Sequence, residues 1–396
     1  MANTLSAAHN PIFYAQEGLI ALTKRLGMAA RVYRGYDDVA TSREKGETIS
    51  IKVPSSFVAQ DAPSTAQDLG TSKIDISLNQ WKEVKFALTD KELSYTSQQI
   101  IAEHINPAAY ALADKIDQVL CGLAVDVPWY SDWSAPAAVT DITSGFRKGM
   151  FARQVDFSNP EKLHCMVSGT IEGELLGLSA FSQNQGAGDQ GVATQLSGHI
   201  GRRFGFNFFA NQNTPSYTSA TVADLAGAVN NGAGYAAGIK SIAVDGLTAS
   251  AALKQGDIVV ITGHTQQYVL TADVTLDGTG AGTLAIFGSP FVQGGGLESA
   301  VVDNQVVTIV LQGGSGATKE HSLAFHEGFA ALAMAKLPDF YDGNGVRVFS
   351  VLDPVTRIGL RARTWVDGNN SKYFVALDCL FGVKTLDGNK AWRMRD

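Results

Sequence analysis

The residues of this chain that could do chemistry are few and scattered. His321 and the pair His326-Glu327 suggest a metal site, but the zinc motif H-E-x-x-H requires a histidine where Ala330 stands. Three cysteines lie far apart without C-x-x-C spacing, which is typical of buried free thiols in a reducing compartment. They are Cys121, Cys165 and Cys379. Neither set predicts a metal centre.

Two glycine-rich stretches carry only part of a ligand-binding motif. Gly313–Lys319 follows a predicted strand as a phosphate-binding loop would, but it lacks the G-K-[ST] ending that places a hydroxyl beside a lysine. Asp273–Gly278 has the aspartates of a calcium loop, with too few oxygen ligands and no closing glutamate. The sequence shows no G-x-S-x-G elbow and no compact Ser/His/Asp or Cys/His grouping. We therefore predict no enzyme, with no catalytic residue, metal site or cofactor.

The composition bounds the class of protein. The chain has 396 residues, enough for two or three domains, of which 45% are hydrophobic and 17% are charged. Its 31 basic and 38 acidic residues give a net charge of −7, which argues against nucleic-acid binding through a general basic face. Residues 1–10 lack the features of a signal peptide, and no apolar run approaches the roughly 18 residues of a membrane span. We expect a soluble protein.

The stretch Thr96–Asp126 predicts the longest helix of the chain. Its apolar residues recur at spacings of three and four, which places them on one helical face. They are Ile101, Ile105, Ala108, Leu112, Ile116, Val119 or Leu120, and Leu123. Four charged residues are predicted to stay largely off that face: Glu103, Asp114, Lys115 and Asp117. Asn106-Pro107 restarts or kinks the helix, because proline lacks the N–H of an interior position but suits a first turn.

Residues 1–46 predict an extended start followed by an amphipathic helix near Tyr14–Leu26, which Gly27 ends. A local basic patch follows, with no acidic residue between Gly18 and Tyr36. Its members are Lys24, Arg25, Arg31 and Arg34. This patch is either a solvated helix end or part of an arm that grips a neighbouring chain.

Residues 47–94 alternate strongly between apolar and polar side chains, which predicts strands. The three apolar runs are Ile49, Ile51 and Val53, then Ile74, Ile76 and Leu78, and then Val84, Phe86 and Leu88. A turn-rich segment separates the first two runs, and the whole predicts a long projecting hairpin. Because a lone two-stranded hairpin is marginal in water, it must lie on something, and a partner subunit is the expected candidate. We therefore predict intersubunit contacts at Lys24, Arg25, Ile49, Ile51, Ile74 and Ile76.

Mixed helix and strand signals fill two further parts of the chain. In the first, we expect a helix at Thr143–Arg153, a strand at Leu163–Ser168, a helix opening at Ser168, an exposed loop at Gln183–Ser197 and an aromatic strand at Phe204–Phe209. In the second, we expect a helix at Glu320–Lys336 and strands at Val346–Val351, Arg357–Thr364 and Lys372–Lys384.

Between these two parts, Tyr217–Gly316 has a different composition, with two basic and seven acidic residues. Strand-like runs recur at hairpin spacing and are separated by glycine- and aspartate-rich turns. The runs are Ser241–Val244, Asp257–Thr262, Gln267–Leu270, Thr283–Phe287 and Val306–Leu311. This pattern predicts a small closed barrel or sandwich inserted between two halves of another domain. We expect flexible glycine-rich hinges near Gly232 and Gly313, so that Gly313–Lys319 is an exit hinge.

The order of these pieces resembles a tailed-bacteriophage major capsid (coat) protein, in the branch that carries a β-barrel inserted in the axial domain. Four segments outside the insertion carry the resemblance. They are Pro11–Leu19 with Val32-Tyr-Arg34, Gly46–Pro54, Asn106–Asp117 and Gly205–Asn213. Inside the insertion, Leu253–Ile261 and Thr283–Pro290 match the style of the family. The stretch Val127–Pro136 has no such counterpart.

The resemblance implies an α+β fold with an N-terminal arm, an extended hairpin loop, a spine helix, and peripheral and axial domains with an inserted all-β barrel. The corresponding segments are the arm (1–46), the hairpin loop (47–94), the spine helix and peripheral domain (95–140), the first part of the axial domain (141–216), the inserted barrel (217–316), and the rest of the axial domain with the return strands of the peripheral domain (317–396). It also implies self-assembly of pentamers and hexamers into an icosahedral virion shell around double-stranded DNA. A scaffolding protein and a portal protein would assist in the host cytoplasm.

Two other functions stay open. An encapsulin-like protein nanocompartment has the same fold and encloses enzyme cargo in place of DNA, although such shells generally lack a large inserted barrel. A carbohydrate-binding or adhesive β-protein would remain a small soluble oligomer. All three are binding or structural proteins, which agrees with the lack of a catalytic cluster in the sequence.

Overall fold

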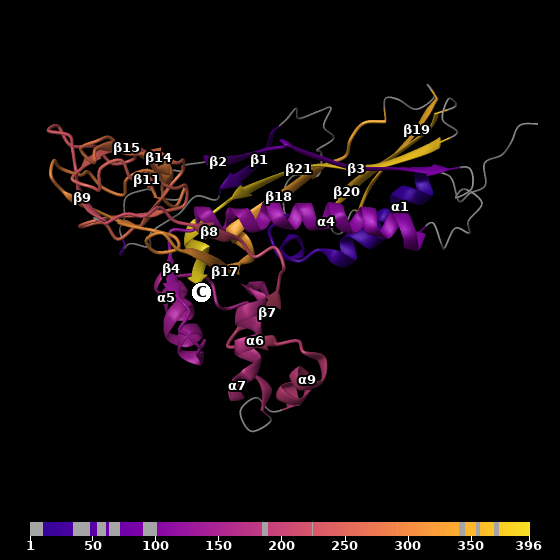
Figure 1. Cartoon of the computed structure of the whole chain (residues 1–396), viewed down its shortest axis with the longest axis horizontal. Helices are drawn as coiled ribbons and strands as arrows, with labels where there is room; N and C mark the ends of the chain where they lie inside the picture. The colour runs from indigo at the N-terminus through magenta and orange to yellow at the C-terminus, as the bar shows by residue number, and fades with distance from the viewer. Residues whose placement is uncertain are drawn as a thin grey trace, which may run out of the picture. The chain divides into compact units, whose positions relative to one another are not determined.

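The computed structural model describes residues 11–34, 48–53, 61–62, 72–89, 101–183, 189–223, 225–290, 292–339, 345–353, 357–367 and 372–396. The chain forms two compact units of mixed helix and sheet (Figure 1). Unit 1 comprises Met1–Asp117 and Ala331–Lys384, and unit 2 comprises Gln118–Ala330 and Thr385–Asp396. The predicted α+β class is confirmed. Within the described residues, no helix has the length and apolar character to span a membrane.

The predicted spine helix is present. A π-helical turn, Ile101–Ile105, leads into α4, Asn106–Cys121, and a 3₁₀ turn at Gly122–Asp126 ends it. The predicted first residues, 96–100, lie outside the described part of the chain. The apolar stripe is buried as expected, because Ile105, Leu112 and Ile116 are almost fully covered. The apolar face of this helix therefore forms part of the hydrophobic core.

The first helix and a five-stranded sheet complete the frame of unit 1. Helix α1 spans Pro11–Arg25, close to the predicted limits. The strands are β3 (Gln80–Thr89), β18 (Ala330–Ala335), β19 (Val346–Leu352), β20 (Gly359–Asp367) and β21 (Lys372–Thr385). Gly18 allows α1 to approach the sheet closely, since a Cβ there would lie 3.0 Å from Cδ2 of Leu360 and 3.4 Å from Cδ1 of Leu377.

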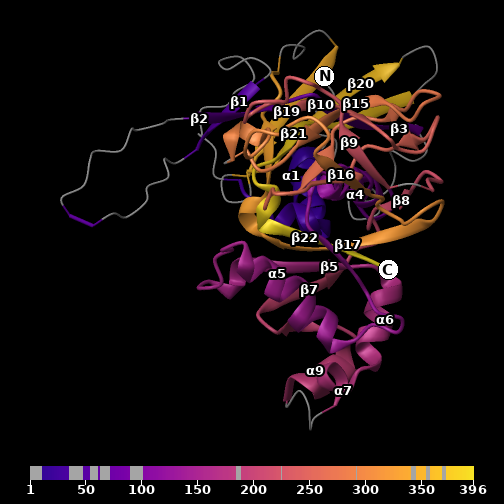
Figure 2. The ribbon, with the colours of Figure 1, turned by 90° about the vertical axis from the view of Figure 1, so that its left-hand side faces the viewer.

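A separate two-stranded sheet forms the hairpin, whose strands lie side by side (Figure 2). Strand β1, Thr48–Val53, pairs antiparallel with β2, Ser72–Ser77. The predicted antiparallel hairpin is therefore confirmed. The third alternating run does not belong to it. That run, β3, pairs with β21 and extends the sheet of unit 1, because β21 has 14 residues and offers it a long free edge.

Unit 2 contains a mixed sheet with the order β4-β22-β17-β5-β7-β6, and β8 pairs with the start of β17. Its strands are β4 (Tyr130–Asp132), β5 (Leu163–Val167), β6 (Gly201–Arg203), β7 (Phe206–Ala210), β8 (Ser216–Thr218), β17 (Thr318–His326) and β22 (Ala391–Arg395). The stretch Val127–Pro136, which has no counterpart in the family resemblance, supplies β4. This strand pairs in parallel with β22. The C-terminal strand thus lies inside the sheet, between β4 and β17.

The helices of unit 2 cover this sheet. They are α5 (Arg147–Ala152), preceded by a π-helical turn at Asp141–Phe146, and α6 (Gly169–Gly177), α7 (Ser179–Ser182) and α9 (Asp189–Ser197). Ser168 caps α6 as predicted, since its Oγ accepts a bond of 3.3 Å from the N–H of Ile171. The predicted loop Gln183–Ser197 is wrong over its second half, which is α9. The buried side chain of Thr194 fixes α9 by accepting a bond of 3.1 Å from Arg203.

The predicted helix Glu320–Lys336 is wrong. The segment forms β17, a 3₁₀ turn at Glu327–Phe329, and β18. From Leu323 to Ala335 nearly every side chain is buried, so the sequence shows no alternation. A continuous apolar run of this kind fits a doubly covered strand as well as a helix, and its alanine, leucine and methionine content favours helix on propensity alone. Tertiary burial decides the outcome.

The inserted segment folds as a closed six-stranded barrel with the order β10-β15-β13-β12-β16-β9. The barrel strands are β9 (Ala226–Val229), β10 (Ser241–Asp245), β12 (Ile258–Ile261), β13 (Tyr268–Leu270), β15 (Gly282–Phe287) and β16 (Val306–Val310), with a small ribbon of β11 (Ala252–Leu253) and β14 (Val274–Thr275). The five predicted strands and the predicted barrel are present. Strand β9 was not predicted, because its four residues, AGAV, are mostly small.

Candidate functional site

The residues predicted to contact a neighbouring subunit lie on different elements. Lys24 is an exposed side chain near the end of α1, and the side chain of Arg25 lies outside the described part of the chain. The four isoleucines lie on the hairpin, where Ile49 is opposite Ile76 and Ile51 is opposite Ile74. The structure therefore brings the hairpin residues together in two cross-strand pairs.

These two pairs differ in their environment. Ile49 and Ile76 are 1% and 0% exposed, whereas Ile51 and Ile74 are half-buried. The expectation that a partner subunit covers the hairpin is therefore wrong at its base, which the same chain covers. There the hairpin lies against β21 at Gly382, where a Cβ would lie 2.2 Å from the carbonyl oxygen of Ser77. Of these four isoleucines, Ile51 and Ile74 are the ones that retain apolar surface for a neighbour.

Asp117 anchors the chain that follows α1. The prediction that its side chain stays off the buried face of α4 is wrong, because the residue is nearly fully buried. Its two carboxylate oxygens accept hydrogen bonds of 2.7 and 2.9 Å from the N–H groups of Gly27 and Ala29. Arg31 lies close to this carboxylate and donates to the carbonyl of Gly27 at 2.7 Å. Burial lowers the pKa of Arg31, and the Asp117 charge opposes that shift.

The predicted basic patch is thus partly used within the chain. Arg31 bonds to Gly27, and Arg34 donates to the carbonyl of Ala29. Both side chains are half-buried. Lys24 is the member of the patch that the structure describes as exposed, so we keep Lys24 as the candidate contact of the arm.

A buried ion pair organises one face of the unit 1 sheet. Asp378 on β21 is fully buried and accepts two bonds from Arg361 on β20, at 3.0 Å from Nε and 2.6 Å from Nη2. Trp81 on β3 donates its indole N–H to the same carboxylate at 2.9 Å, and Arg363 lies 3.4 Å away. A bidentate arginine and an indole donor satisfy the carboxylate that the sheet removes from water. One buried carboxylate therefore ties three strands together.

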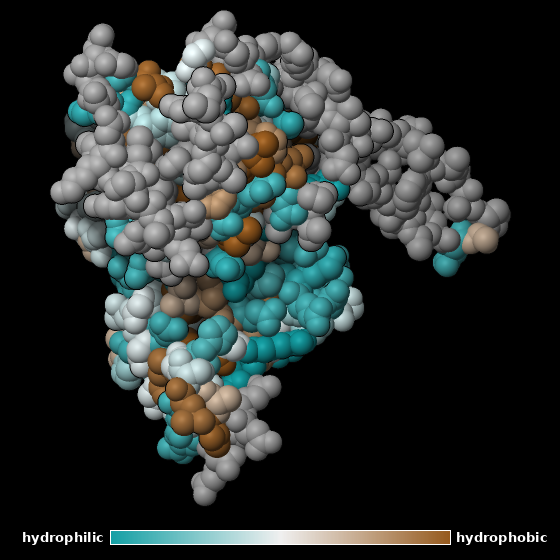
Figure 3. All heavy atoms as spheres, turned by 90° about the vertical axis from the view of Figure 1, so that its right-hand side faces the viewer, coloured by the Kyte–Doolittle hydropathy of each residue, from teal (hydrophilic) through white to brown (hydrophobic). Residues whose placement is uncertain are grey.

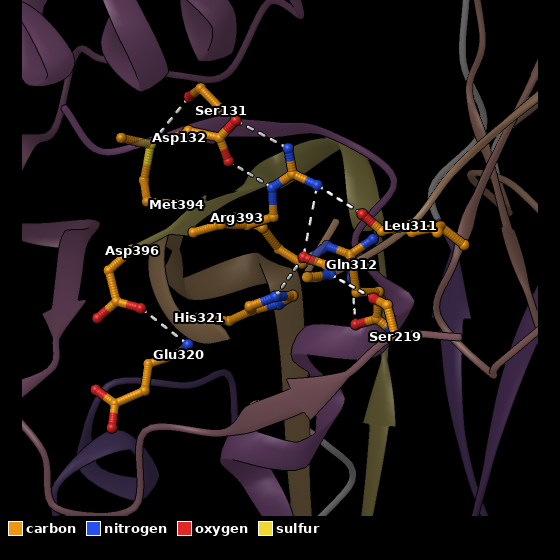
Figure 4. A network of polar contacts seen from close by, with 12 residues as sticks. Ser131, Asp132, Ser219, Leu311, Gln312, Glu320, His321, Arg393, Met394 and Asp396 are labelled. Atoms are coloured by element: carbon orange, nitrogen blue, oxygen red, sulfur yellow. Dashed lines mark hydrogen bonds and ion pairs between the residues drawn. The ribbon is translucent and has the colours of Figure 1, made fainter. Parts of the chain in front are cut away.

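A second buried polar network lies at the base of the inserted barrel (Figure 4). Arg393 on β22 is almost fully buried and donates to Oε1 of Gln312 at 2.9 Å and to the carbonyl of Gly256 at 3.0 Å. The N–H of Gln312 in turn donates to the fully buried carboxylate of Asp257 at 3.0 Å. Burial lowers the pKa of Arg393 to about 10. The C-terminal strand of the chain thus holds the last residues of the barrel.

A two-strand stem joins the barrel to the sheet of unit 2. Strand β8 pairs with the start of β17, and the hydroxyls of Thr218 and Thr318 lie 2.7 Å apart. At the exit, the N–H of Gly313 donates to the buried hydroxyl of Ser219 at 2.6 Å. The predicted flexible hinge at Gly313–Lys319 is therefore wrong. The exit is a hydrogen-bonded stem, because the two ends of the insertion meet as antiparallel neighbours.

The two histidines that suggested a metal site in the sequence, His321 and His326, lie on β17 and not on a helix. His321 is fully buried, and its Nε2 lies 3.1 Å from the carbonyl oxygen of Gln312, which gives it a place in the same network. His326 accepts a bond of 3.0 Å from the N–H of Gly328 and caps the following turn. Within the described residues, no three His, Cys, Asp or Glu side chains form a metal-binding group.

We expect His321 to make unit 2 sensitive to acid. Burial, with a smaller contribution from the charge of Arg393, lowers its pKa to about 3. The unfolded chain therefore binds a proton below about pH 6.5 that the folded chain does not take up until about pH 3. Stability should fall as the pH drops through this window, with a slope of up to about 1.4 kcal/mol per pH unit.

Urea unfolding of unit 2 between pH 7 and pH 4 measures this slope. The variant His321→Gln should flatten it, whereas His199→Gln should not, since His199 is exposed. An unchanged slope in His321→Gln would show that other groups carry the acid sensitivity.

Several large apolar side chains among the described residues are exposed to solvent. Leu196 on α9 is 85% exposed, and Val192 one turn earlier is also exposed. Figure 3 shows hydrophobic side chains gathered at the end of unit 2 that carries α7 and α9. Phe151 on α5 is 72% exposed and Val302 on the barrel is 66% exposed. Exposed apolar residues in groups mark interaction surfaces.

No protein-family model matches the chain, and no curated protein matches its sequence. Among solved structures, the chain is similar to one from Mycobacterium phage Che8, with 14% identity over 93% of this chain and 90% of that chain and a TM-score of 0.48. It is also similar to the capsid structure of the cyanophage P-SCSP1u, with 10% identity, coverage of 92% and 86%, and a TM-score of 0.45. A third is a virus-like particle from Pyrococcus furiosus, with 6% identity, coverage of 97% and 98%, and a TM-score of 0.37.

Proposed function

We propose that this chain is a major capsid protein that assembles with copies of itself into an icosahedral shell around double-stranded DNA. The observation that carries the proposal is the order of elements along the chain. An arm helix, a two-stranded hairpin, a spine helix and a mixed sheet interrupted by a closed barrel follow one another as the sequence resemblance predicts.

The individual elements support a role in assembly. The hairpin is a two-stranded sheet whose outer isoleucine pair, Ile51 and Ile74, is only half-covered, and such a hairpin is marginal unless something lies against it. The net charge of −7 suits a container, because a strongly basic lining would hold the genome tightly against the shell. The proposed function therefore depends on the interfaces of this protein rather than on catalysis.

The finer roles belong to the same proposal. Residues 1–46 form the arm, 47–94 the hairpin loop, 95–140 the spine and peripheral part, and 217–316 the inserted barrel, with the axial part before and after it. Pentamers and hexamers assemble in the host cytoplasm with a scaffolding protein and a portal protein, and the mature chain is part of the virion. The DNA is enclosed without sequence-specific contacts.

We expect the outer part of the hairpin to be required for assembly. The double variant Ile51→Asp/Ile74→Asp places two charges on the half-buried cross-strand pair, where a neighbouring subunit would have to desolvate them. Shell yield should fall at least tenfold while the subunit stays folded. Sedimentation velocity measures the yield, and circular dichroism checks the fold.

Ile49→Val/Ile76→Val is the matched control, because it alters the covered pair of the same hairpin by one methylene per residue. The control should assemble at nearly normal yield. Normal shells from the aspartate variant would exclude the hairpin as an intersubunit element.

The contents of purified particles distinguish the capsid from its rivals. Particles made with the neighbouring genes present should protect double-stranded DNA from nuclease. Particles that hold protein cargo and no DNA would instead identify a compartment shell. A small oligomer that binds immobilised glycans would identify the carbohydrate-binding alternative.

A further inference from the structure

One surface of unit 2 combines basic side chains with an exposed aromatic ring. Helix α5 buries Met150 in the core of the unit and turns Arg147, Lys148 and Phe151 to the outside, where all three are exposed. Gly149 holds the helix close to the sheet, since a Cβ there would lie 2.2 Å from the ring of Trp392. The patch Arg147–Lys148–Phe151, here called the α5 patch, is therefore fixed in place.

The charges of the α5 patch are not neutralised within the described chain. Arg147 donates to the carbonyl of Phe204 at 3.1 Å and lies over the ring of Phe157. Within the described residues, no carboxylate lies within 4.0 Å of the cations of Arg147 or Lys148. Among the described residues, the patch therefore offers two cations without a carboxylate partner beside an apolar ring.

The barrel carries a surface of complementary character. The turn Val302–Val306 exposes two valines, of which Val302 is 66% exposed, and the carboxylate of Asp303. The carboxylate is oriented by the N–H of Asn231, which donates to it at 2.9 Å. No lysine or arginine occurs from residue 255 to residue 318, the stretch that contains this turn. The barrel turn pairs apolar side chains with negative charge.

We propose that the α5 patch of one copy docks on the barrel turn of a second copy. This inference rests on the proposed self-assembly and names one of its contacts. The ring of Phe151 would meet the valines, while Arg147 and Lys148 would face Asp303. Because the two surfaces differ, the contact is heterologous and can be repeated from copy to copy, as a shell requires.

Nucleic acid is the less suitable occupant of the α5 patch. Phosphates would satisfy the two cations but leave the ring of Phe151 without a role on a duplex. An apolar anchor bordered by cations fits a protein surface with an apolar centre and an acidic rim.

Charge exchange tests the docking. The variant Arg147→Glu/Lys148→Glu should reduce shell yield at least tenfold, as measured by sedimentation velocity in the presence of the helper proteins. Adding Asp303→Lys should restore at least a third of the yield, since the charges are then exchanged across the contact. A matched control is Arg202→Glu/Lys240→Glu, which reverses two exposed cations elsewhere on unit 2 and should assemble normally.

Two single variants test the apolar half without changing charge. Phe151→Ser and Val302→Ser remove exposed side chains, so each should stay folded by circular dichroism and lower the yield severalfold. Normal yields from both would overturn the docking.

The outcomes separate this inference from the proposed function. If the wild-type chain forms no particles, the proposed function fails. If it forms particles and Arg147→Glu/Lys148→Glu does so equally well, the docking fails and the capsid function stands. Normal shells that retain less DNA would assign the patch to nucleic acid and also overturn the docking. Failure of Asp303→Lys to restore the yield would exclude the barrel turn as the partner.

Discussion

Replacing Asp378 by alanine is expected to lower the free energy of unfolding of unit 1 by roughly 3–5 kcal/mol, because breaking a buried ion pair leaves an uncompensated charge. The charge left behind is the buried guanidinium of Arg361. In the wild-type chain this group donates to both carboxylate oxygens of Asp378. The indole N–H of Trp81 loses its acceptor as well. Urea unfolding of the unassembled subunit, followed by the fluorescence of Trp81 and Trp365, measures the change.

Two further variants make this prediction specific. Arg361→Met/Asp378→Leu removes both charges and should be much less destabilised than Asp378→Ala, since replacing both members of a buried pair by apolar groups is often nearly neutral. Lys73→Ala removes an exposed ion pair with Asp75 in the same unit and should leave the stability nearly unchanged, because solvent screens such pairs. Equal effects from Asp378→Ala and Lys73→Ala would show that burial does not set the contribution of the pair.

Replacing Arg393 by alanine is expected to loosen the base of the barrel and to destabilise unit 2 by about 3 kcal/mol. The estimate rests on the buried partners that would be left unpaired, each of which costs about 1–3 kcal/mol. These are Oε1 of Gln312 and the carbonyl of Gly256, while Asp257 loses a nearby positive charge. Denaturant unfolding followed by the tryptophans of unit 2 measures the loss.

Limited trypsin digestion gives a local readout of the same change. Lys319 lies in the stem, where it is paired with Tyr217, so its cleavage should be slow in the wild-type chain and faster in Arg393→Ala. Lys240→Ala on the exposed barrel surface is the control and should change neither measurement. Unchanged stability and unchanged cleavage in Arg393→Ala would mean that Arg393 does not hold the barrel.

The sequence predicted the barrel well because its strands alternate. In β10 and β15 one face fills the barrel and the other meets solvent, so Ile242 and Leu284 are buried while their neighbours are not. The same logic failed for β17 and β18, which are covered on both faces and therefore lack a period. Periodicity reports the contrast between two faces, and a doubly buried strand has none.

The buried polar contacts were predictable only in part. Asp117 was placed outside the buried face because it is charged, although Ala113 and Leu120, one turn before and one turn after it, are both buried. Those neighbours were a usable signal. The partners of Arg393 gave no such signal, because Gly256 and Gln312 are more than 80 residues away in sequence and only the fold brings them to the C-terminal strand.

Self-assembly into a shell is most directly tested by electron microscopy of the expressed full-length chain, alone and together with the products of its neighbouring genes. We expect closed particles of uniform diameter in at least one of these preparations, with the chain as their main protein. A chain that stays a monomer or small oligomer in every preparation, while remaining folded, would contradict this expectation.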